Sequence, residues 1–379
     1  MNKIELSIYK QSIKYFSLFD VLIKGEAYNR DEFLKTLDIT PNSYRRSKNY
    51  EQKIGTEIVL TLSKYFGYSV STDKLINYIE DLTNSIYNDM YYKVFRNYDF
   101  YISEVDRLIE QKYNVYPILN LLKLFLQINS LKKGAKVISE NQAFYEEVKK
   151  YKNFFNDDLL KIFELLYLTF EKDVTEYALA EEFSDGFSYF IVSYRSWLNK
   201  KYVDCLYFAE KAQLILLREN NFKRILYLNF NVMSSLNYVK NYKACLDMCQ
   251  KQMLALNSFE CGGFERENTL KHMIVAALGL KDYQLVVNLL SNNENYSLTE
   301  LTCYLFAMSK LSIKDYQNYF SDNIHLEDYN ENNRNFLIIL NKFILNNDKK
   351  LLIQLEQYNF VKAILEILKN AWNFFLGSK

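Results

Sequence analysis

The chain has 379 residues, of which 49% are hydrophobic and 25% are charged, and its formal net charge is +1. This apolar content is sufficient for a large core, and the near-neutral charge excludes a protein that binds polyanions over its whole surface. Nine Gly and two Pro are far fewer than average usage gives. The sequence therefore predicts a chain that is mostly helical.

Cysteine usage and the N-terminus indicate the compartment. An odd number of cysteines, five, fits a reducing compartment better than a disulfide framework. Residues 1–20 carry charges throughout and lack the apolar centre of a signal peptide. No run of 18 apolar residues occurs, so no membrane span is expected. We therefore expect a cytoplasmic protein.

Residues 1–70 contain signals for four short helices. The first apolar-periodic segment stops at Gly25, and Asn29 is a candidate N-cap for the second. Thr40 is a candidate N-cap for the third, in which Pro41 fits the first turn. The fourth ends at Gly67, a C-cap residue. Helix, tight three-residue turn and basic helix predict a helix-turn-helix DNA-binding domain over residues 1–70.

The expected recognition helix starts with polar residues that suit DNA. The candidate DNA contacts are Thr40, Asn42, Arg45, Arg46 and Lys48. Arg commonly reads guanine and Asn adenine, whereas Thr and Lys commonly hold phosphate. The alternative is a solvated helix face with two adjacent basic residues. Residues 1–70 carry 11 Lys and Arg against 8 Asp and Glu, a net +3, which favours an interaction protein whose N-terminal bundle does not bind DNA.

A short phrase ending in tyrosine recurs in the second half of the chain. The tyrosines are Tyr202, Tyr242, Tyr283 and Tyr316, separated by 40, 41 and 33 residues, and each lies between two helix-like patterns. Such a period is typical of a helical solenoid, whose units stack because none buries its own apolar face. We expect a helical-repeat domain over residues 71–379. An apolar final helix, from Val361 to Phe375, is expected to cap it or to form a subunit contact.

Two stretches resemble known motifs. The stretch that begins at Lys200-Lys201-Tyr202 resembles the second helix of a tetratricopeptide repeat, whose small-residue positions are taken by Cys205, Ala209 and Ala212. Residues 33–47 resemble the helix-turn-helix of Cro/repressor-like regulators, with matching positions at Leu37, Ile39, Thr40 and Arg46. Asp38 replaces the turn glycine, and Asp tolerates left-handed geometry. Tyr44 stands where an aliphatic residue is usual.

Together the two motifs resemble the Firmicute peptide-sensing regulators, the Rgg, PlcR, PrgX and Rap group and the related arbitrium receptors. The resemblance implies an all-α fold: an N-terminal helix-turn-helix bundle followed by a right-handed α-α superhelix of tetratricopeptide-like repeats. It implies a transcription regulator that binds double-stranded DNA, binds a short signalling peptide on the concave face and forms a homodimer through its C-terminal half. Peptide binding would change DNA binding by shifting conformational populations.

Candidate peptide contacts lie on the first helices of three repeat units. They are Tyr194, Tyr227, Asn237, Asn268 and Lys271. Asn donates and accepts hydrogen bonds at once, so it suits the backbone of an extended peptide. The alternative is that Asn, which is abundant throughout this chain, occurs on these faces by composition alone.

The sequence contains no signal for catalysis or for a cofactor. Cys245, Cys249, Cys261 and His272 include no paired metal knuckle, and packing as buried apolar residues explains the cysteines better. Phosphate loops, nucleophile elbows and metalloprotease motifs are missing. We expect no enzyme, no cofactor and no metal. The competing hypotheses are an interaction scaffold that does not bind DNA and a Rap-type co-regulator.

Overall fold

The structure is a computed structural model that describes residues 14–27, 29–49, 55–92, 97–129, 135–171, 185–258, 263–291, 297–346, 348–355 and 357–358. Within these ranges the chain forms helices and no strand, apart from an isolated parallel bridge between Ser69 and Tyr113. The predicted all-α class is confirmed. The helix expected from Val361 to Phe375 lies outside the described residues.

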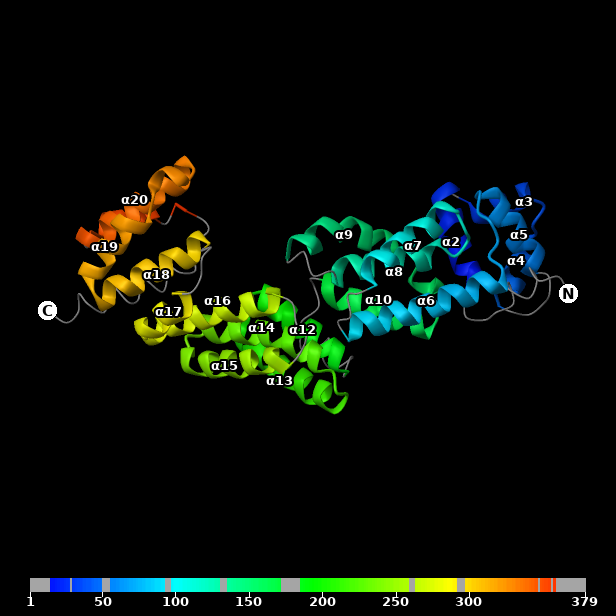
Figure 1. Ribbon diagram of the computed structural model, residues 1–379. Helices are drawn as coiled ribbons and strands as arrows, with labels where there is room; N and C mark the ends of the chain where they lie inside the picture. Colours follow the sequence, from blue (N-terminus) through cyan, green and yellow to red (C-terminus); the bar gives the residue numbers. More distant parts are fainter. Residues whose placement is uncertain are drawn as a thin grey trace. The chain divides into compact units, whose positions relative to one another are not determined.

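The chain divides into two compact units, residues 1–198 with 211–224 and residues 199–210 with 225–379. The expected boundary at residue 70 falls inside the first unit and stays a prediction. Figure 1 shows the helices described up to residue 198: α2 (Tyr15–Glu26), α3 (Arg30–Thr36), α4 (Pro41–Lys48), α5 (Gly55–Tyr65), α6 (Asp73–Tyr91), α7 (Tyr98–Glu110), α8 (Tyr116–Asn129), α9 (Ala135–Lys149), η1 (Lys152–Phe154), α10 (Asp157–Phe170) and α12 (Gly186–Leu198).

The helices that follow form hairpins along the chain. They are α13 (Tyr202–Arg218), α14 (Phe222–Tyr238), α15 (Tyr242–Ser258), α16 (Gly263–Leu280), α17 (Tyr283–Leu290), α18 (Leu298–Leu311), α19 (Ile313–Asn323), η2 (Leu326–Asp328), α20 (Glu331–Asn346) and α21 (Lys349–Leu355). From α15 to α19 each helix packs against the next. A helical-repeat domain would show such packing, and the superhelix of repeats stays a prediction.

Both predicted N-caps of the N-terminal bundle are confirmed. The Asn29 side chain accepts hydrogen bonds from the backbone amides of Asp31 and Glu32, at the start of α3. The Thr40 side chain accepts one from the Ser43 amide at 3.1 Å, and Pro41 is the first residue of α4. Each cap satisfies amides that have no partner inside the helix. Local sequence therefore marks where these helices begin.

The turn between α3 and α4 depends on a left-handed residue. Asp38 has φ 57°, the conformation that the turn glycine of related motifs supplies. The amide of Ile39 donates to the Leu34 carbonyl at 2.9 Å, which closes the end of α3 as a Schellman motif does. Leu34 and Tyr44 are completely buried and Ile39 is 6% exposed, so the turn packs both short helices against the bundle.

The segment after α5 is tied to the turn between α7 and α8. The Ser69 amide donates to the Lys112 carbonyl and the Asn114 amide donates back to the Ser69 carbonyl, both at 2.9 Å. The buried Asn114 side chain accepts from the amide and the hydroxyl of Ser71, at 3.1 and 2.9 Å. These bonds attach the N-terminal bundle to the rest of the first unit.

Arg224 joins parts of the first unit that are far apart in sequence. Its side chain is completely buried, its Nε donates to the Tyr91 carbonyl at 3.1 Å, and an NH2 group donates to the Met90 carbonyl. The guanidinium lies 4.0 Å from the ring centroid of Phe187 and 4.7 Å from that of Phe190. A cation at the carboxyl end of α6 complements the helix dipole, and the rings add cation–π attraction.

In the second unit the recurring phrase forms the turn within a hairpin. Lys200, Lys240 and Lys281 have φ of 60° or 61°, and each stands two residues before the tyrosine that begins the next helix. Schellman bonds accompany two of these turns, from the amides of Asn241 and Asp282 to carbonyls five residues earlier, at 2.8 and 2.9 Å. Lysine therefore stands where glycine usually ends a helix.

The first three tyrosines of the phrase each pack on the following helical hairpin. Tyr202 stacks on Tyr238 at 4.4 Å, and Tyr283 meets Phe306 edge to face at 6.1 Å. The ring of Tyr242 lies directly on Gly279. At each of these three positions one aromatic side chain therefore contacts the next hairpin.

The fourth tyrosine also contacts the next hairpin, through a hydrogen bond from its hydroxyl to Asn341 of α20 at 2.6 Å, but it does not begin its helix. There α19 starts at Ile313, capped by the Ser312 side chain, and Tyr316 lies inside the helix and is fully buried. Its spacing of 33 residues is shorter than the others because α17 has 8 residues, whereas α13 and α15 have 17 each.

Candidate functional site

The second short helix of the N-terminal bundle presents a polar face. Asn42, Arg45 and Arg46 are exposed and stand at positions i, i+3 and i+4 of α4. Residues at this spacing lie on one face of a helix. Tyr44 and Ser47, on the other side of α4, are buried. The structure therefore brings three of the five predicted DNA contacts together on one exposed surface.

Tyr44 fixes the orientation of that face. Its hydroxyl donates to the Asp20 carboxylate at 2.9 Å, and its ring meets Phe16 edge to face at 5.3 Å. Burial and the neighbouring Asp20 carboxylate raise the pKa of Tyr44 well above its ordinary value, so the phenol stays protonated and donates. The aromatic residue at an expected aliphatic position thus adds a polar contact that an aliphatic residue cannot make.

Three of the five predicted DNA contacts already have partners within the bundle. The Thr40 side chain caps α4, and the Lys48 ammonium is paired with Asp20. The Arg45 guanidinium lies 3.6 Å from the Asp31 carboxylate, with both side chains largely exposed. Within the described ranges the Arg46 guanidinium forms no ion pair. Arg46 is therefore the predicted contact whose charge is least compensated by the protein.

Two of the predicted peptide contacts join α14 to α16. The Tyr227 hydroxyl donates to the buried Glu265 carboxylate at 2.7 Å. The Asn237 amide group donates to the His272 carbonyl at 3.2 Å. These bonds join α14 to α16 at two places, which is a structural role for both residues.

The other predicted peptide contacts differ in their surroundings. Asn268 is half-buried on α16 and makes no side-chain hydrogen bond to a described residue. Lys271 is exposed and pairs with Glu267 at 2.6 Å. Tyr194 belongs to the first compact unit and stacks on Trp197 at 5.8 Å. The structure therefore brings four of the five residues onto one pair of helices, and Tyr194 is not among them.

A row of buried polar atoms on α14 is not marked by any motif in the sequence. Asn231 and Ser235 stand one turn apart, and Nδ2 of Asn231 and Oγ of Ser235 have no hydrogen-bond partner among the described residues. The same holds for Oδ1 of Asn237. A buried polar atom without a partner costs about 1–3 kcal/mol, and such atoms commonly bind water or a ligand. In the sequence, the spacing of four residues between Tyr227, Asn231 and Ser235 indicates that these polar side chains share one face of α14.

The sulfur atoms of this region pack as apolar groups. Cys245 and Cys249 are fully buried with their sulfurs 3.9 Å apart. Burial lowers the pKa of His272 to about 4, so its ring is neutral at physiological pH. No set of three or more metal-ligating side chains occurs in the described part of the chain, and Cys261 lies outside it.

Comparisons with known proteins do not place the chain in a family. No protein-family model matches it, and neither a curated protein nor a solved structure gives a significant match. Among the described helices, none combines the length and the apolar character needed to cross a bilayer.

Proposed function

We propose that this protein is a cytosolic DNA-binding transcription regulator whose helical repeats sense a short peptide, and that it acts as a homodimer. The observation that carries the proposal is the exposed face of α4, where Asn42, Arg45 and Arg46 project from a helix pinned by Tyr44. A rigid short helix with two arginines and an asparagine on one face suits insertion into the major groove.

The two arginines differ in what DNA binding requires of them. Arg46 can contact a guanine or a phosphate directly, whereas Arg45 must first break its ion pair with Asp31. An exposed ion pair of this kind is worth at most about 1 kcal/mol, so DNA phosphates compete with it easily. Substituting Asp31→Asn therefore tightens DNA binding several-fold, mostly at low salt.

The DNA test is binding of the full chain to the DNA upstream of its own gene, followed by fluorescence anisotropy across a salt series. We expect Arg45→Ala/Arg46→Ala to weaken binding and to reduce the salt slope by about one for each lost phosphate contact. The matched control is Lys35→Ala/Lys64→Ala, which removes the same charge from exposed positions outside α4. Equal losses in the two double variants would show that only net charge matters.

The polar row on α14 supports the peptide half of the proposal. An extended peptide offers backbone donors and acceptors, which suit buried side-chain atoms that lack partners. We expect peptides from the culture supernatant to change DNA affinity, and Asn231→Ala to abolish that response while DNA binding without peptide is kept. Asn229→Ala is the control, because the Asn229 side chain on the same helix already donates to Gln252 at 2.8 Å.

A second candidate function is a protein-interaction scaffold whose N-terminal bundle does not bind DNA. The pairs Lys48–Asp20 and Arg45–Asp31 favour it, because they reduce the positive charge around α4. In that case upstream and random DNA bind equally weakly, with or without peptide.

A further inference from the structure

The first compact unit contains a cavity that the proposed function does not use. It lies between α6, α8 and the start of α10 and has a volume of about 250 Å³. Its apolar lining consists of buried residues: Ile76, Ile79, Val115, Ile118 and Leu159. A buried aliphatic floor favours a ligand with a slender hydrocarbon body.

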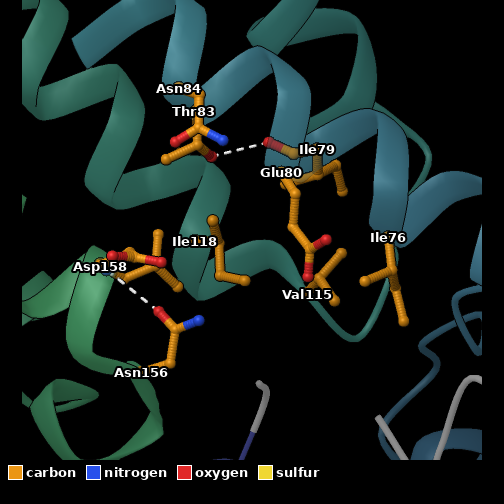
Figure 2. A pocket seen from close by; sticks show the side chains of 10 residues that line it. Ile76, Ile79, Glu80, Thr83, Asn84, Val115, Ile118, Asn156 and Asp158 are labelled. Atoms are coloured by element: carbon orange, nitrogen blue, oxygen red, sulfur yellow. Dashed lines mark hydrogen bonds between the residues drawn. The ribbon is translucent and has the colours of Figure 1, made fainter. Parts of the chain in front are cut away.

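The polar lining of the cavity carries negative charge and no positive charge. It includes the carboxylates of Glu80, on α6, and Asp158, on α10, together with the side chains of Asn84 and Asn156. In Figure 2 the two carboxylate residues stand on either side of Ile118. The cavity wall therefore has an apolar side chain, Ile118, between two negatively charged groups, Glu80 and Asp158.

Nearby groups leave both carboxylates open to a ligand. Asp158 lies 3.7 Å from Lys161, but their side chains are 78% and 66% exposed, so this surface pair is weak. Glu80 is exposed and forms no ion pair with a described residue. The Asn156 side chain caps α10 by accepting from the Leu159 amide at 3.0 Å, which fixes that wall.

We propose that this cavity binds a linear aliphatic diamine or polyamine. One terminal ammonium pairs with Glu80, the other pairs with Asp158, and the methylene chain lies over Ile118. Ammonium groups on an aliphatic stem keep their charge in water while the stem covers apolar surface, as lysine side chains do. Because the two carboxylates come from different helices, the ligand links α6 to α10.

The experiment is isothermal titration of the full chain with 1,5-diaminopentane, 1-aminopentane and 1,5-pentanediol. We expect the diamine to bind about three- to tenfold more tightly than the monoamine and the diol not to bind, because each exposed charge pair adds a modest factor. Glu80→Gln and Asp158→Asn should each weaken binding of the diamine until it is no tighter than binding of the monoamine to the parent chain. Lys161→Gln should tighten binding by removing a competing cation.

Controls separate a built site from general attraction of cations. Asp157→Asn removes a neighbouring exposed charge that does not line the cavity and should leave affinity unchanged. Asn84→Trp changes an exposed rim residue and should block entry while far-UV circular dichroism stays that of the parent. The proposal is overturned if diamine and monoamine bind equally, if Asp157→Asn weakens binding as much as Asp158→Asn does, or if no saturable binding occurs.

Discussion

Gly279 should be a glycine because Tyr242 occupies the space of a side chain. Gly279 lies in α16, near its carboxyl end, and a Cβ added there would stand 2.5 Å from Cγ and Cδ2 of Tyr242. Ordinary contacts between carbon atoms are about 3.5–4.0 Å. Gly279→Ala therefore forces the Tyr242 ring, and with it the contact between neighbouring hairpins, to shift.

The size of the effect follows from two opposing contributions. Overpacking a core costs about 1–3 kcal/mol, whereas Ala favours a helix over Gly by about 1 kcal/mol. We expect a net loss of about 1 kcal/mol in the free energy of unfolding. Gly25, in α2, has no heavy atom within 4 Å of an added Cβ, so Gly25→Ala should gain roughly 0.5–1 kcal/mol. The same substitution, Gly to Ala, should thus lower the free energy of unfolding at Gly279 and raise it at Gly25.

The assay is urea unfolding followed by far-UV circular dichroism, with each variant compared with the parent chain in the transition of its own compact unit. Introducing Gly279→Ala into a Tyr242→Leu background completes a double-mutant cycle. We expect a coupling of about 1 kcal/mol, because the smaller side chain makes room for the methyl group. Stabilisation by Gly279→Ala equal to that of Gly25→Ala, together with zero coupling, would refute the close contact.

Three further predictions concern stability. Lys240→Gly should raise the free energy of unfolding by about 0.5–1 kcal/mol in urea, because it removes the left-handed strain of a side chain at φ 61°, and an unchanged midpoint would contradict this. Arg224→Met should lower the free energy of unfolding by about 3 kcal/mol, because the Met90 and Tyr91 carbonyls at the end of α6 lose their donors. A loss below about 1 kcal/mol would argue against a stabilising role for these buried hydrogen bonds. Burial lowers the pKa of His272 to about 4 from an ordinary 6.5, so the unfolded chain binds the extra proton between these values. The free energy of unfolding should therefore fall as the pH drops from 6.5 to about 4, by at most about 1.4 kcal/mol per pH unit. This contribution to the pH dependence should disappear in His272→Gln.

Part of the site could be predicted from local sequence. The caps at Asn29 and Thr40 and the left-handed Asp38 involve bonds across two to five residues, so the pattern of α3 and α4 specifies them directly. The exposed face of α4 follows from helical spacing in the same way. The ion pair of Lys48 with Asp20 was not predictable, because it joins residues 28 positions apart through the packing of α4 on α2.

The sequence by itself determined the helical class and the caps that begin α3 and α4. Scarce glycine, apolar periodicity and capping residues act through the backbone within a single turn, and each carries its own signal. Only the tertiary structure decided that Tyr242 needs Gly279, that Arg224 closes the end of α6, and that Glu80 and Asp158 share a cavity. Such pairings are selected by many weak contacts between distant residues acting together, so no single stretch of sequence contains them.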